Sequence, residues 1–567
     1  MTTIPTPEPA AHPALTDLAA SFGRRVERVG DRVLVAIGYG LANTVVIIGD
    51  GGLVVVDTME GVQAASEARD AIREHTDLPV RGVIYTHGHP DHVWGTRAWV
   101  SPEDEPGVEI VAHETVPYYV NEFANILAPR YTLGAMHMYG SLLPDGPEGF
   151  IVNGIGQRVR AGADRGFIPP TTTFRDEQEL TIAGVRLQVQ FTPGESPDEI
   201  LVWLPDDGIV LSADTVYRSF PNVYTIRGAR YRDPRDWYSS VDRIRALGAE
   251  HLVPCHGAPV SGAAEVDAVL TTYRDGIQYV FDQTIRGMNA GRTPDELAAT
   301  VRLPEHLASS PWLAELYGKV EICVRNIYAG LYGWFSGDGA DLLPPPPGEE
   351  AAEVVALAGG PDAAAAALRD AVADGRMAWA AKLASWLLRA EPDIDEALAQ
   401  EVKRLKATAL RSMAYATINA NARNWWLTEA AVLDGTIAMD LPAIAGFVAR
   451  SNAAELLHGV PERDTVEALS LRLDPERSAD TTVRVGLALV DATPCTLAIR
   501  RGVCAIEDGV DGCDLTVTLR RDDLIALVTG ALSWHDALAT DEVALDGDRD
   551  RLLATVALFD GWEAPEG

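Results

Sequence analysis

The sequence has 567 residues, too many for one hydrophobic core, and an apolar content ordinary for globular proteins, so about two to four folded domains are expected. Its formal net charge of −35 repels phosphate backbones and anionic lipid heads, which excludes nucleic acids and membranes as main partners. Five scattered cysteines without a C-x-x-C pair, no bilayer-spanning stretch and no secretory signal at the N-terminus predict a cytoplasmic protein without membrane insertion.

Residues up to about 265 alternate between short β-branched runs and segments with helical apolar spacing. Two β-branched runs joined by Gly-Gly or Asp-Asp-Gly are typical of a β-hairpin. Apolar residues spaced three and four apart indicate an amphipathic helix. The elements predicted here are hairpins of 44–48 with 53–56 and of 201–204 with 209–211, a helix over 61–75, and a buried strand over 83–85.

The second half of the chain has a different pattern. Consecutive prolines within 342–348 cannot continue a helix and predict a linker. Residues 351–433 are rich in Ala and Leu with helical spacing, which predicts an array of helical hairpins. After about residue 441 the pattern becomes that of a small α+β domain. Its predicted elements are strands within 481–506 and 515–519 and a helix over 522–532.

The strongest chemical signal is the segment 86–92, Thr-His-Gly-His-Pro-Asp-His, directly after a predicted buried strand. Side chains two apart in an extended segment point the same way, so His87 and His89 can hold one metal ion. Asp91 and His92 open a helix and can face a second ion. Imidazole and carboxylate groups suit Zn²⁺, and they also accept manganese or iron. The alternative is a polar loop with chance histidines.

Three further ligand candidates follow later apolar strands. The C-terminal ends of strands are where α/β sheets present ligands. A single loop carboxylate is more often solvated, but in this order after the histidine segment these residues become ligand candidates. They are Glu195, Asp214 and His256.

The order of these residues resembles that of the metallo-β-lactamase superfamily, in which the second ligand segment commonly supplies histidine rather than Glu195. The wider sequence is similar to the zinc-dependent, class III alkyl sulfatases, which act on detergents such as dodecyl sulfate. The likeness covers nearly the whole chain, and its Tyr-Thr-Ile-Arg-Gly and Met-Tyr-Gly segments are more specific than the histidine motif. The segments that carry it are 38–43, 138–144, 154–156, 195–199, 222–229, 273–275, 282–284 and 333–335.

The resemblance implies an α/β fold with three domains. The first is an αββα sandwich catalytic domain over 1–343, with a helical extension from about residue 265. An all-α dimerisation domain over 350–440 follows, so a homodimer is expected. The last, over 441–567, resembles α+β sterol-carrier-protein-like domains. For this last domain, an apolar groove that holds an alkyl chain and an ordinary packed core remain equal alternatives.

The resemblance also assigns two zinc ions to the predicted ligands, although the bridging carboxylate stays open. Asp57 matches a residue that orients a ligand histidine, and a plain strand-end turn residue is its alternative. One zinc is assigned to His87, His89 and Glu195, the other to Asp91, His92 and His256, and Asp214 is assigned as the bridge.

Four positions match family residues that contact the substrate. A guanidinium makes paired, charge-assisted hydrogen bonds to sulfate oxygens, which is the physical reason for an arginine among them. The matching positions are Arg227, Tyr139, Gly156 and Asn222, and catalysis is assigned to Asp91, Arg227 and Tyr139.

The expected reaction is hydrolysis of an alkyl sulfate ester to an alcohol and inorganic sulfate by a zinc-activated water. Attack at sulfur and attack at carbon both remain open. Attack at sulfur requires an acid for the departing alkoxide. The family histidine at that place is Pro221 here, which leaves His137 as a candidate. The alternatives are hydrolysis of a phosphodiester, lactone or β-lactam, and a lipid-binding protein with a relic metal site.

Overall fold

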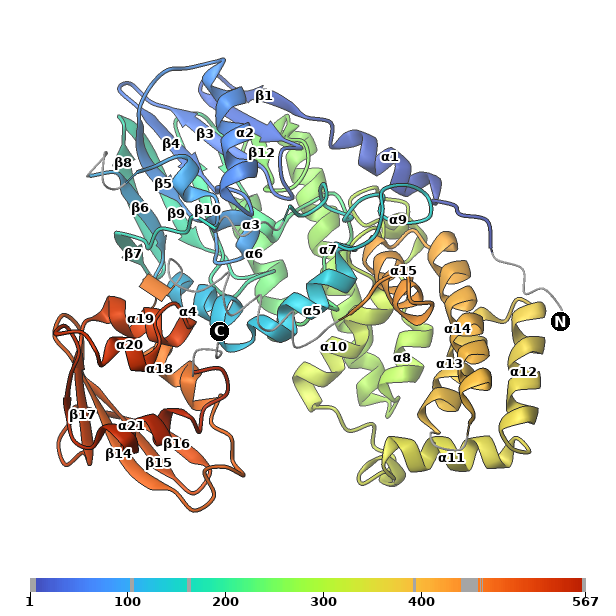
Figure 1. The fold of residues 1–567 in the computed structure, drawn as a ribbon. Helices are drawn as coiled ribbons and strands as arrows, with labels where there is room; N and C mark the ends of the chain where they lie inside the picture. Colours follow the sequence, from blue (N-terminus) through green and yellow to red (C-terminus); the bar gives the residue numbers. More distant parts are fainter. Residues whose placement is uncertain are drawn as a thin grey trace.

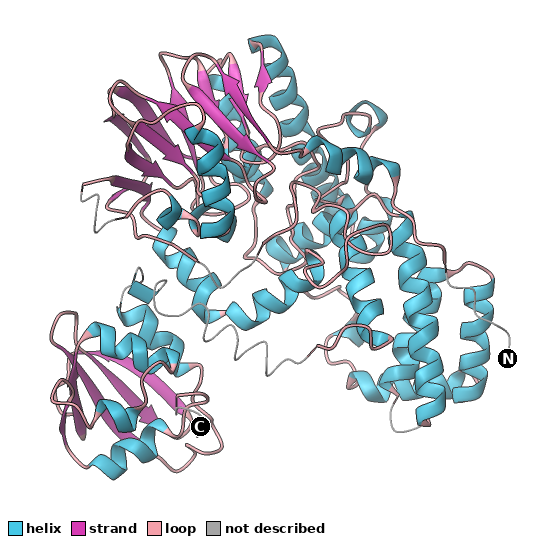
Figure 2. Cartoon of the chain, turned by 45° about the horizontal axis from the view of Figure 1, so that its top comes forward, coloured by secondary structure: helices cyan, strands magenta, loops and turns pink. Residues whose placement is uncertain are grey.

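The computed structural model describes residues 7–101, 107–160, 165–390, 394–439, 457–458, 460 and 462–562. In its N-terminal part, two β-sheets pack face to face and helices cover both outer faces, as Figures 1 and 2 show. This is the αββα sandwich expected from the sequence.

The first sheet has 7 strands paired in chain order. Its first three pairings are antiparallel and its last three are parallel. The hairpin predicted over 44–48 and 53–56 is confirmed as β3 and β4. The strands are β1 (Arg25–Val29), β2 (Val33–Ile37), β3 (Thr44–Ile48), β4 (Leu53–Val56), β5 (Val80–Ile84), β6 (Glu109–His113) and β7 (Thr172–Phe174).

The second sheet has 6 strands in the order β13-β12-β11-β10-β9-β8. Its one parallel pairing joins β11 to β12, and the predicted hairpin over 201–204 and 209–211 is confirmed as β10 and β11. The strands are β8 (Glu177–Ile182), β9 (Val185–Phe191), β10 (Ile200–Leu204), β11 (Ile209–Leu211), β12 (His251–Val253) and β13 (Val260–Ser261).

Side-chain alternation along β2 explains how the first sheet can be buried on both faces. Val33, Val35 and Ile37 belong to the core between the sheets, whereas Leu34 and Ala36 belong to the core on the other face. Helix α2 covers that outer face, and α6 and α7 cover the outer face of the second sheet. The helices of this part are α1 (Pro13–Ser21), α2 (Val62–Arg73), α3 (Pro90–Val93), η1 (Thr96–Ala98), α4 (Val116–Asn121), η2 (Glu122–Ile126), α5 (Ala128–Met138), η3 (Ala213–Thr215), α6 (Pro234–Ala246) and α7 (Ala263–Asn289).

The helical part confirms the predicted array and its proline-rich linker. The last proline of the linker is the first residue of α11, where a missing N–H costs nothing. Among the described residues no single helix combines the length and apolar character needed to cross a membrane, although α11 and α12, which meet at 83°, reach those limits as a bent pair. The helices are α8 (Pro294–Thr300), α9 (Glu305–Ala308), α10 (Val320–Tyr332), η4 (Gly339–Asp341), α11 (Pro347–Leu357), α12 (Pro361–Ala373), α13 (Met377–Arg389), α14 (Glu396–Ala416) and α15 (Ala420–Leu433).

Arg423 on α15 ties this array to the rest of the chain. Its guanidinium is buried and donates to the carbonyl oxygens of Ala10 (2.9 Å) and Ala414 (3.2 Å). It also donates to those of Pro147 (2.6 Å) and Gly149 (3.2 Å). One side chain therefore joins the N-terminal arm, a loop of the sandwich part and the helical array.

The C-terminal part is an α+β unit whose 5 strands have the order β16-β15-β14-β17-β18. It lies beside α4 in Figure 1, and α18 contacts η2. The predicted boundary at 440/441 lies outside the described residues. Its elements are α18 (Glu462–Ser470), β14 (Thr482–Leu489), β15 (Cys495–Arg500), β16 (Val503–Asp508), β17 (Leu515–Leu519), α19 (Arg521–Thr529), α20 (Trp534–Ala537), β18 (Ala544–Asp546) and α21 (Arg549–Val556).

Candidate active site

The predicted metal ligands come together at one edge of the sandwich. His87 follows β5, Glu195 follows β9, Asp214 follows β11 and His256 follows β12. The C-terminal ends of these strands meet there because the two sheets face each other. Of the seven predicted ligands, all but the half-buried Asp91 are buried.

One group of ligand atoms is formed by His87, His89 and Asp214. Nε2 of His87 lies 2.8 Å from Nδ1 of His89 and 3.6 Å from Oδ2 of Asp214. The two imidazoles therefore face the same point, as the extended segment predicted.

A second group is formed by Asp91, His92 and His256. Oδ2 of Asp91 lies 3.4 Å from Nε2 of His92 and 3.6 Å from Nε2 of His256. Asp214 also reaches this group, with its oxygens 3.5 Å from His92 Nε2 and 3.1 Å from His256 Nε2. Asp214 thus contacts histidines of both groups.

Glu195 has a different neighbour. Its Oε1 accepts a hydrogen bond from Nη1 of Arg232 at 3.0 Å, and its Oε2 has no hydrogen-bond partner among the described residues. The sequence predicts Glu195 as a ligand with His87 and His89, whereas the carboxylate that forms a group with those two histidines is that of Asp214.

These residues fit divalent metal binding. Nitrogen and oxygen ligand atoms within each group lie within 4.8 Å of one another. Nε2 of His92, like Oε2 of Glu195, lacks a hydrogen-bond partner in the described part of the chain. Burying several carboxylates together is costly unless positive charge compensates them, and a metal supplies that charge.

The electrostatics favour the metal-binding forms of His87 and Asp214, whereas neighbouring carboxylates, against the effect of burial, raise the pKa values of His92 and His256. Burial, together with the charge of His92, lowers the pKa of His87 to about 3, which keeps its imidazole neutral. Burial opposes the charge of Asp214, but His256 and His92 hold the pKa of this carboxyl well below its usual range. Metal ligands must be deprotonated, so both shifts act in the required direction.

Asp57 lies behind the ligand groups and orients the imidazole of His92. Its Oδ2 accepts from Nδ1 of His92 (2.7 Å), Oγ1 of Thr86 (2.7 Å) and Sγ of Cys255 (3.1 Å), and its Oδ1 accepts from the Thr86 N–H (2.8 Å). The φ of Asp57 is +58°, a left-handed conformation uncommon for residues other than Gly, Asn and Asp. The carboxylate fixes the tautomer of His92, so that Nε2 faces Asp91 and Asp214.

Two further buried carboxyls shape the loop that carries Glu195. Oε2 of Glu199 accepts from the Glu195 N–H at 2.9 Å, and Oδ2 of Asp198 accepts from the Gly88 N–H at 2.8 Å. Burial raises the pKa of Asp198 to about 6, and burial with the charges of Asp214 and Glu195 raises that of Glu199. Asp198 thus links the Glu195 loop to the His87–His89 segment.

Arg227 lies against the first group of ligands. It is 7% exposed, its Nη2 lies 3.5 Å from Nε2 of His89, and its guanidinium lies 5.0 Å from the centre of the Phe123 ring. Burial opposes its charge, but the neighbouring hydroxyls of Tyr139 and Tyr317 raise its pKa overall. The Tyr139 and Tyr317 hydroxyl oxygens are 3.4 Å apart. Tyr139, predicted at the site, is therefore there.

Gly156 and Asn222 also lie close to the site. A Cβ on Gly156 would be 2.1 Å from the carbonyl oxygen of Leu41, the atom that bonds Nδ1 of His256 at 3.0 Å. The backbone N–H of Asn222 donates to the Tyr217 hydroxyl at 2.8 Å, and its side-chain Nδ2 has no partner among the described residues. Gly156 thus permits the close approach that orients His256.

His137, the candidate acid, contacts the helical array. Its ring packs against Trp425 of α15, with centroids 4.9 Å apart, and its Nδ1 bonds the carbonyl of Leu133 at 2.9 Å. These contacts assign His137 to the packing of α5 on the helical array. Pro221 contributes a carbonyl that the Sγ of Cys323 approaches at 3.7 Å.

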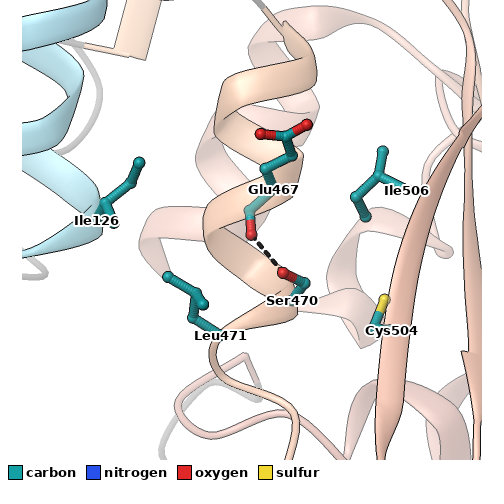
Figure 3. Close-up of a pocket in the computed structure, with 6 residues that line it drawn as sticks. All are labelled: Ile126, Glu467, Ser470, Leu471, Cys504 and Ile506. Atoms are coloured by element: carbon teal, nitrogen blue, oxygen red, sulfur yellow. Dashed lines mark hydrogen bonds between the residues drawn. The ribbon is translucent and has the colours of Figure 1, made fainter.

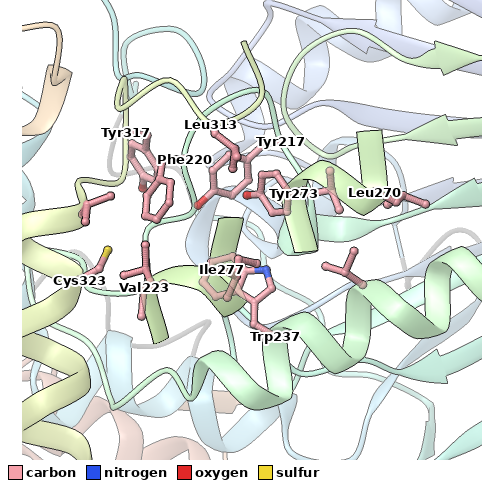
Figure 4. Close-up of a cluster of buried hydrophobic side chains, with 14 of the residues drawn as sticks. Tyr217, Phe220, Val223, Trp237, Leu270, Tyr273, Ile277, Leu313, Tyr317 and Cys323 are labelled. Atoms are coloured by element: carbon pink, nitrogen blue, oxygen red, sulfur yellow. The ribbon is translucent and has the colours of Figure 1, made fainter. Parts of the chain in front are cut away.

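Sequence reasoning missed several buried polar residues at the site. Arg232 lies five residues after Arg227 in the same segment, which was the available signal. Tyr217 follows Asp214 by three residues, and Tyr273 lies in the segment 273–275 that carries the family resemblance. Tyr317 comes from a distant segment that gives no such signal. Figure 4 shows Tyr217, Tyr273 and Tyr317 together in the buried cluster under the site.

Sequence models of known families match most of the chain. The metallo-beta-lactamase superfamily matches residues 37–256. Alkyl sulfatase dimerisation matches residues 293–435, and the alkyl sulfatase C-terminal domain matches residues 450–564.

Individual relatives agree with these matches. A linear primary-alkylsulfatase from Pseudomonas sp. is 38% identical over 91% of this chain and 98% of its own length. An (R)-specific secondary-alkylsulfatase from Pseudomonas sp. is 27% identical over 93% of this chain and 79% of its own. The solved structure of the stereoselective inverting sec-alkylsulfatase Pisa1 from Pseudomonas sp. superposes with a TM-score of 0.89 at 25% identity, covering 97% of this chain and 87% of Pisa1. The full-length match, the three family domains and the ligand geometry together place this chain in the alkylsulfatase family of the metallo-β-lactamase superfamily.

Proposed function

We propose that this protein hydrolyses alkyl sulfate esters to an alcohol and inorganic sulfate with two zinc ions. The observation that carries the proposal is the buried guanidinium of Arg227 beside His89, at the edge of the ligand groups. A sulfate monoester is a compact anion, and on a chain of net charge −35 a local arginine is needed to attract it. The names of the relatives support the same substrate class.

The ligand groups support a distribution of residues between the two ions. His87 and His89 would serve one ion with Glu195, Asp91, His92 and His256 would serve the other, and Asp214 contacts both groups. A bound zinc pair supplies a water activated at neutral pH and positive charge for the ester oxygens.

The chain's own residues would perform the remaining tasks. Arg227 would bind the sulfate oxygens, with Tyr139 beside it. Asp57 would hold the proton of His92 on Nδ1 and keep its Nε2 free. The overall reaction consumes one water and releases the alcohol, the sulfate dianion and one proton.

The test is sulfate release from dodecyl sulfate and from a secondary octyl sulfate by protein of measured metal content. We expect zinc-dependent release, and loss of roughly 100-fold or more in kcat/KM for Arg227→Ala, because a buried guanidinium makes more than one charge-assisted bond of about 1.5–3 kcal/mol. Arg235→Gln, at an exposed arginine paired with Asp233, is the matched control. Release from neither ester by fully metallated protein would contradict the proposal and favour a phosphodiester or lactone substrate.

We also propose a homodimer formed through the helical part. Apolar side chains stand exposed there, notably Leu343 at 90% and Trp334 at 70%. Such side chains on a surface are typical of an interface. Leu343→Asp should shift the protein toward monomer in analytical ultracentrifugation, while Leu343→Met should not. A monomeric wild-type protein at micromolar concentration would contradict the dimer.

We propose that the alkyl chain enters an open pocket of about 360 Å³ between η2 and the C-terminal part, which Glu467 and Ser470 line together with apolar side chains. Figure 3 shows Ile126 of η2 opposite Leu471, with Cys504 and Ile506 beyond. Phe123, on the same short helix as Ile126, lies against His89. Leu471→Asp should raise KM for dodecyl sulfate more than for hexyl sulfate. Equal effects on the KM values of both esters would show that the alkyl chain of the substrate does not bind in this pocket.

A further inference from the structure

A second arginine is buried at the site with unused hydrogen-bonding capacity. Arg232 is 3% exposed. Its Nη1 donates to Oε1 of Glu195 at 3.0 Å and to the carbonyl of Asn222. Its Nε and Nη2 have no hydrogen-bond partner among the described residues, and neither has Nδ2 of Asn222 beside it.

This arrangement is costly unless an acceptor binds there. A buried donor without a partner costs about 1–3 kcal/mol, and more when it is charged. Arg232 cannot lose its proton to avoid the cost. Arg232 and Asn222 together present free N–H groups from two side chains, which suits a ligand that carries several acceptor oxygens.

The fold leaves Arg232 little freedom to turn away. The next residue, Asp233, caps α6 by accepting from the Arg235 N–H. Trp237, one turn into α6, is fully buried, and its Nε1 donates to the carbonyl of Thr215 at 2.8 Å. Figure 4 shows Trp237 inside the same cluster as Tyr217. The helix start thus fixes the backbone next to Arg232.

Arg232 and Arg227 both lie next to predicted metal ligands. Arg227 lies 3.5 Å from His89, and Arg232 lies 3.0 Å from Glu195. The two guanidinium groups therefore face the ligand groups from the same segment, 227–232.

We propose that Arg232 is a second sulfate-binding residue, which contacts sulfate oxygens through its Nε and Nη2 while Nη1 stays on Glu195. The inference rests on the proposed function, because it takes the sulfate ester as the anion that enters. Two guanidinium groups match a sulfate monoester, whose charge is spread over three oxygens. The competing role is that Arg232 only neutralises Glu195.

Calorimetric binding of inorganic sulfate to the zinc-loaded protein, with metal content measured on the same samples, separates these roles. We expect Arg232→Gln to weaken sulfate binding at least 10-fold with unchanged metal content. Arg232→Lys keeps a charge for Glu195 but loses the fork, so it should also weaken binding and decides the matter if Arg232→Gln does not fold. Arg235→Gln is the control and should bind like the wild type. Unchanged sulfate binding in either folded variant, or weakening that only accompanies metal loss, would overturn the inference.

Hydrolysis of dodecyl sulfate by the wild-type protein is measured in parallel. Sulfate binding that depends on Arg232 without any ester hydrolysis would refute the proposed function and leave the anion site standing. Hydrolysis by the wild type with unchanged sulfate binding in the Arg232 variants would refute the role of Arg232 and leave the proposed function standing.

Discussion

Replacing Asp57 with asparagine changes one atom behind the site and should reverse the tautomer of His92. The Thr86 N–H donates to Oδ1 of Asp57, so the amide oxygen of the new side chain would take that position. The amide NH₂ would then face Nδ1 of His92, where Oδ2 now lies 2.7 Å away. His92 Nδ1 would become an acceptor and its proton would move to Nε2, the atom that faces Asp91 and Asp214.

The expected magnitude follows from this orienting role. Loss of a carboxylate that orients a ligand histidine weakens metal binding about 10–100-fold, or about 1.4–2.7 kcal/mol. The fold should persist, because asparagine tolerates the left-handed φ of +58° found at Asp57. Competition of the protein with a chelator of known zinc affinity measures the change.

Asp70→Asn, at an exposed carboxylate on α2, is the control and should leave zinc affinity unchanged. Zinc affinity of Asp57→Asn within about twofold of the wild type would refute the reasoning, because it would show that the His92 tautomer is fixed by something other than Asp57.

Two further predictions concern stability. Gly156→Ala would put a Cβ 2.1 Å from the Leu41 carbonyl oxygen, so we expect the free energy of unfolding, measured with denaturant, to fall by about 1–3 kcal/mol. An unchanged free energy of unfolding would show that the backbone at Leu41 moves aside at little cost. Burial lowers the pKa of His113, so the unfolded chain binds this proton more readily than the native one, and the stability that His113 contributes is lost as pH falls below about 6.5, by at most about 1.4 kcal/mol per pH unit. The free energy of unfolding of the wild type minus that of His113→Leu should therefore decrease from pH 7.5 to pH 5.5. A value that does not change with pH would contradict this prediction.

The local features of the fold were predictable from sequence because they depend on neighbouring residues. The hairpin over 44–56 and the helix over 61–75 follow from β-branched runs, glycines and apolar spacing, and both formed. The proximity of His87 and His89 follows from the two-residue period of an extended chain. Such signals need no knowledge of tertiary packing.

The parts that escaped prediction depend on contacts between distant segments. The ion pair of Glu195 with Arg232 spans 37 positions. The sequence does not predict it, because arginine is rarely buried and a surface position is the default expectation. Tyr317 reaches the site from the helical part, where its backbone carbonyl accepts hydrogen bonds from the side chains of Asn419 and Asn421 at the start of α15. The packing of His137 on Trp425 likewise depends on a helix far along the chain.

The four carbonyls bound by Arg423 determine how the molecule can be divided. The bond to Ala10 closes a loop of 413 positions, so this contact of the N-terminal segment forms only after α15 exists. Such long-range closure slows folding and makes the joined segments unfold together. A sandwich expressed without the helical array would leave the carbonyls of Pro147 and Gly149 without their donor. The proline linker therefore marks a change of architecture, but contacts between the sandwich part and the helical array continue beyond it, and those of Arg423 form only after residue 423 has been synthesised.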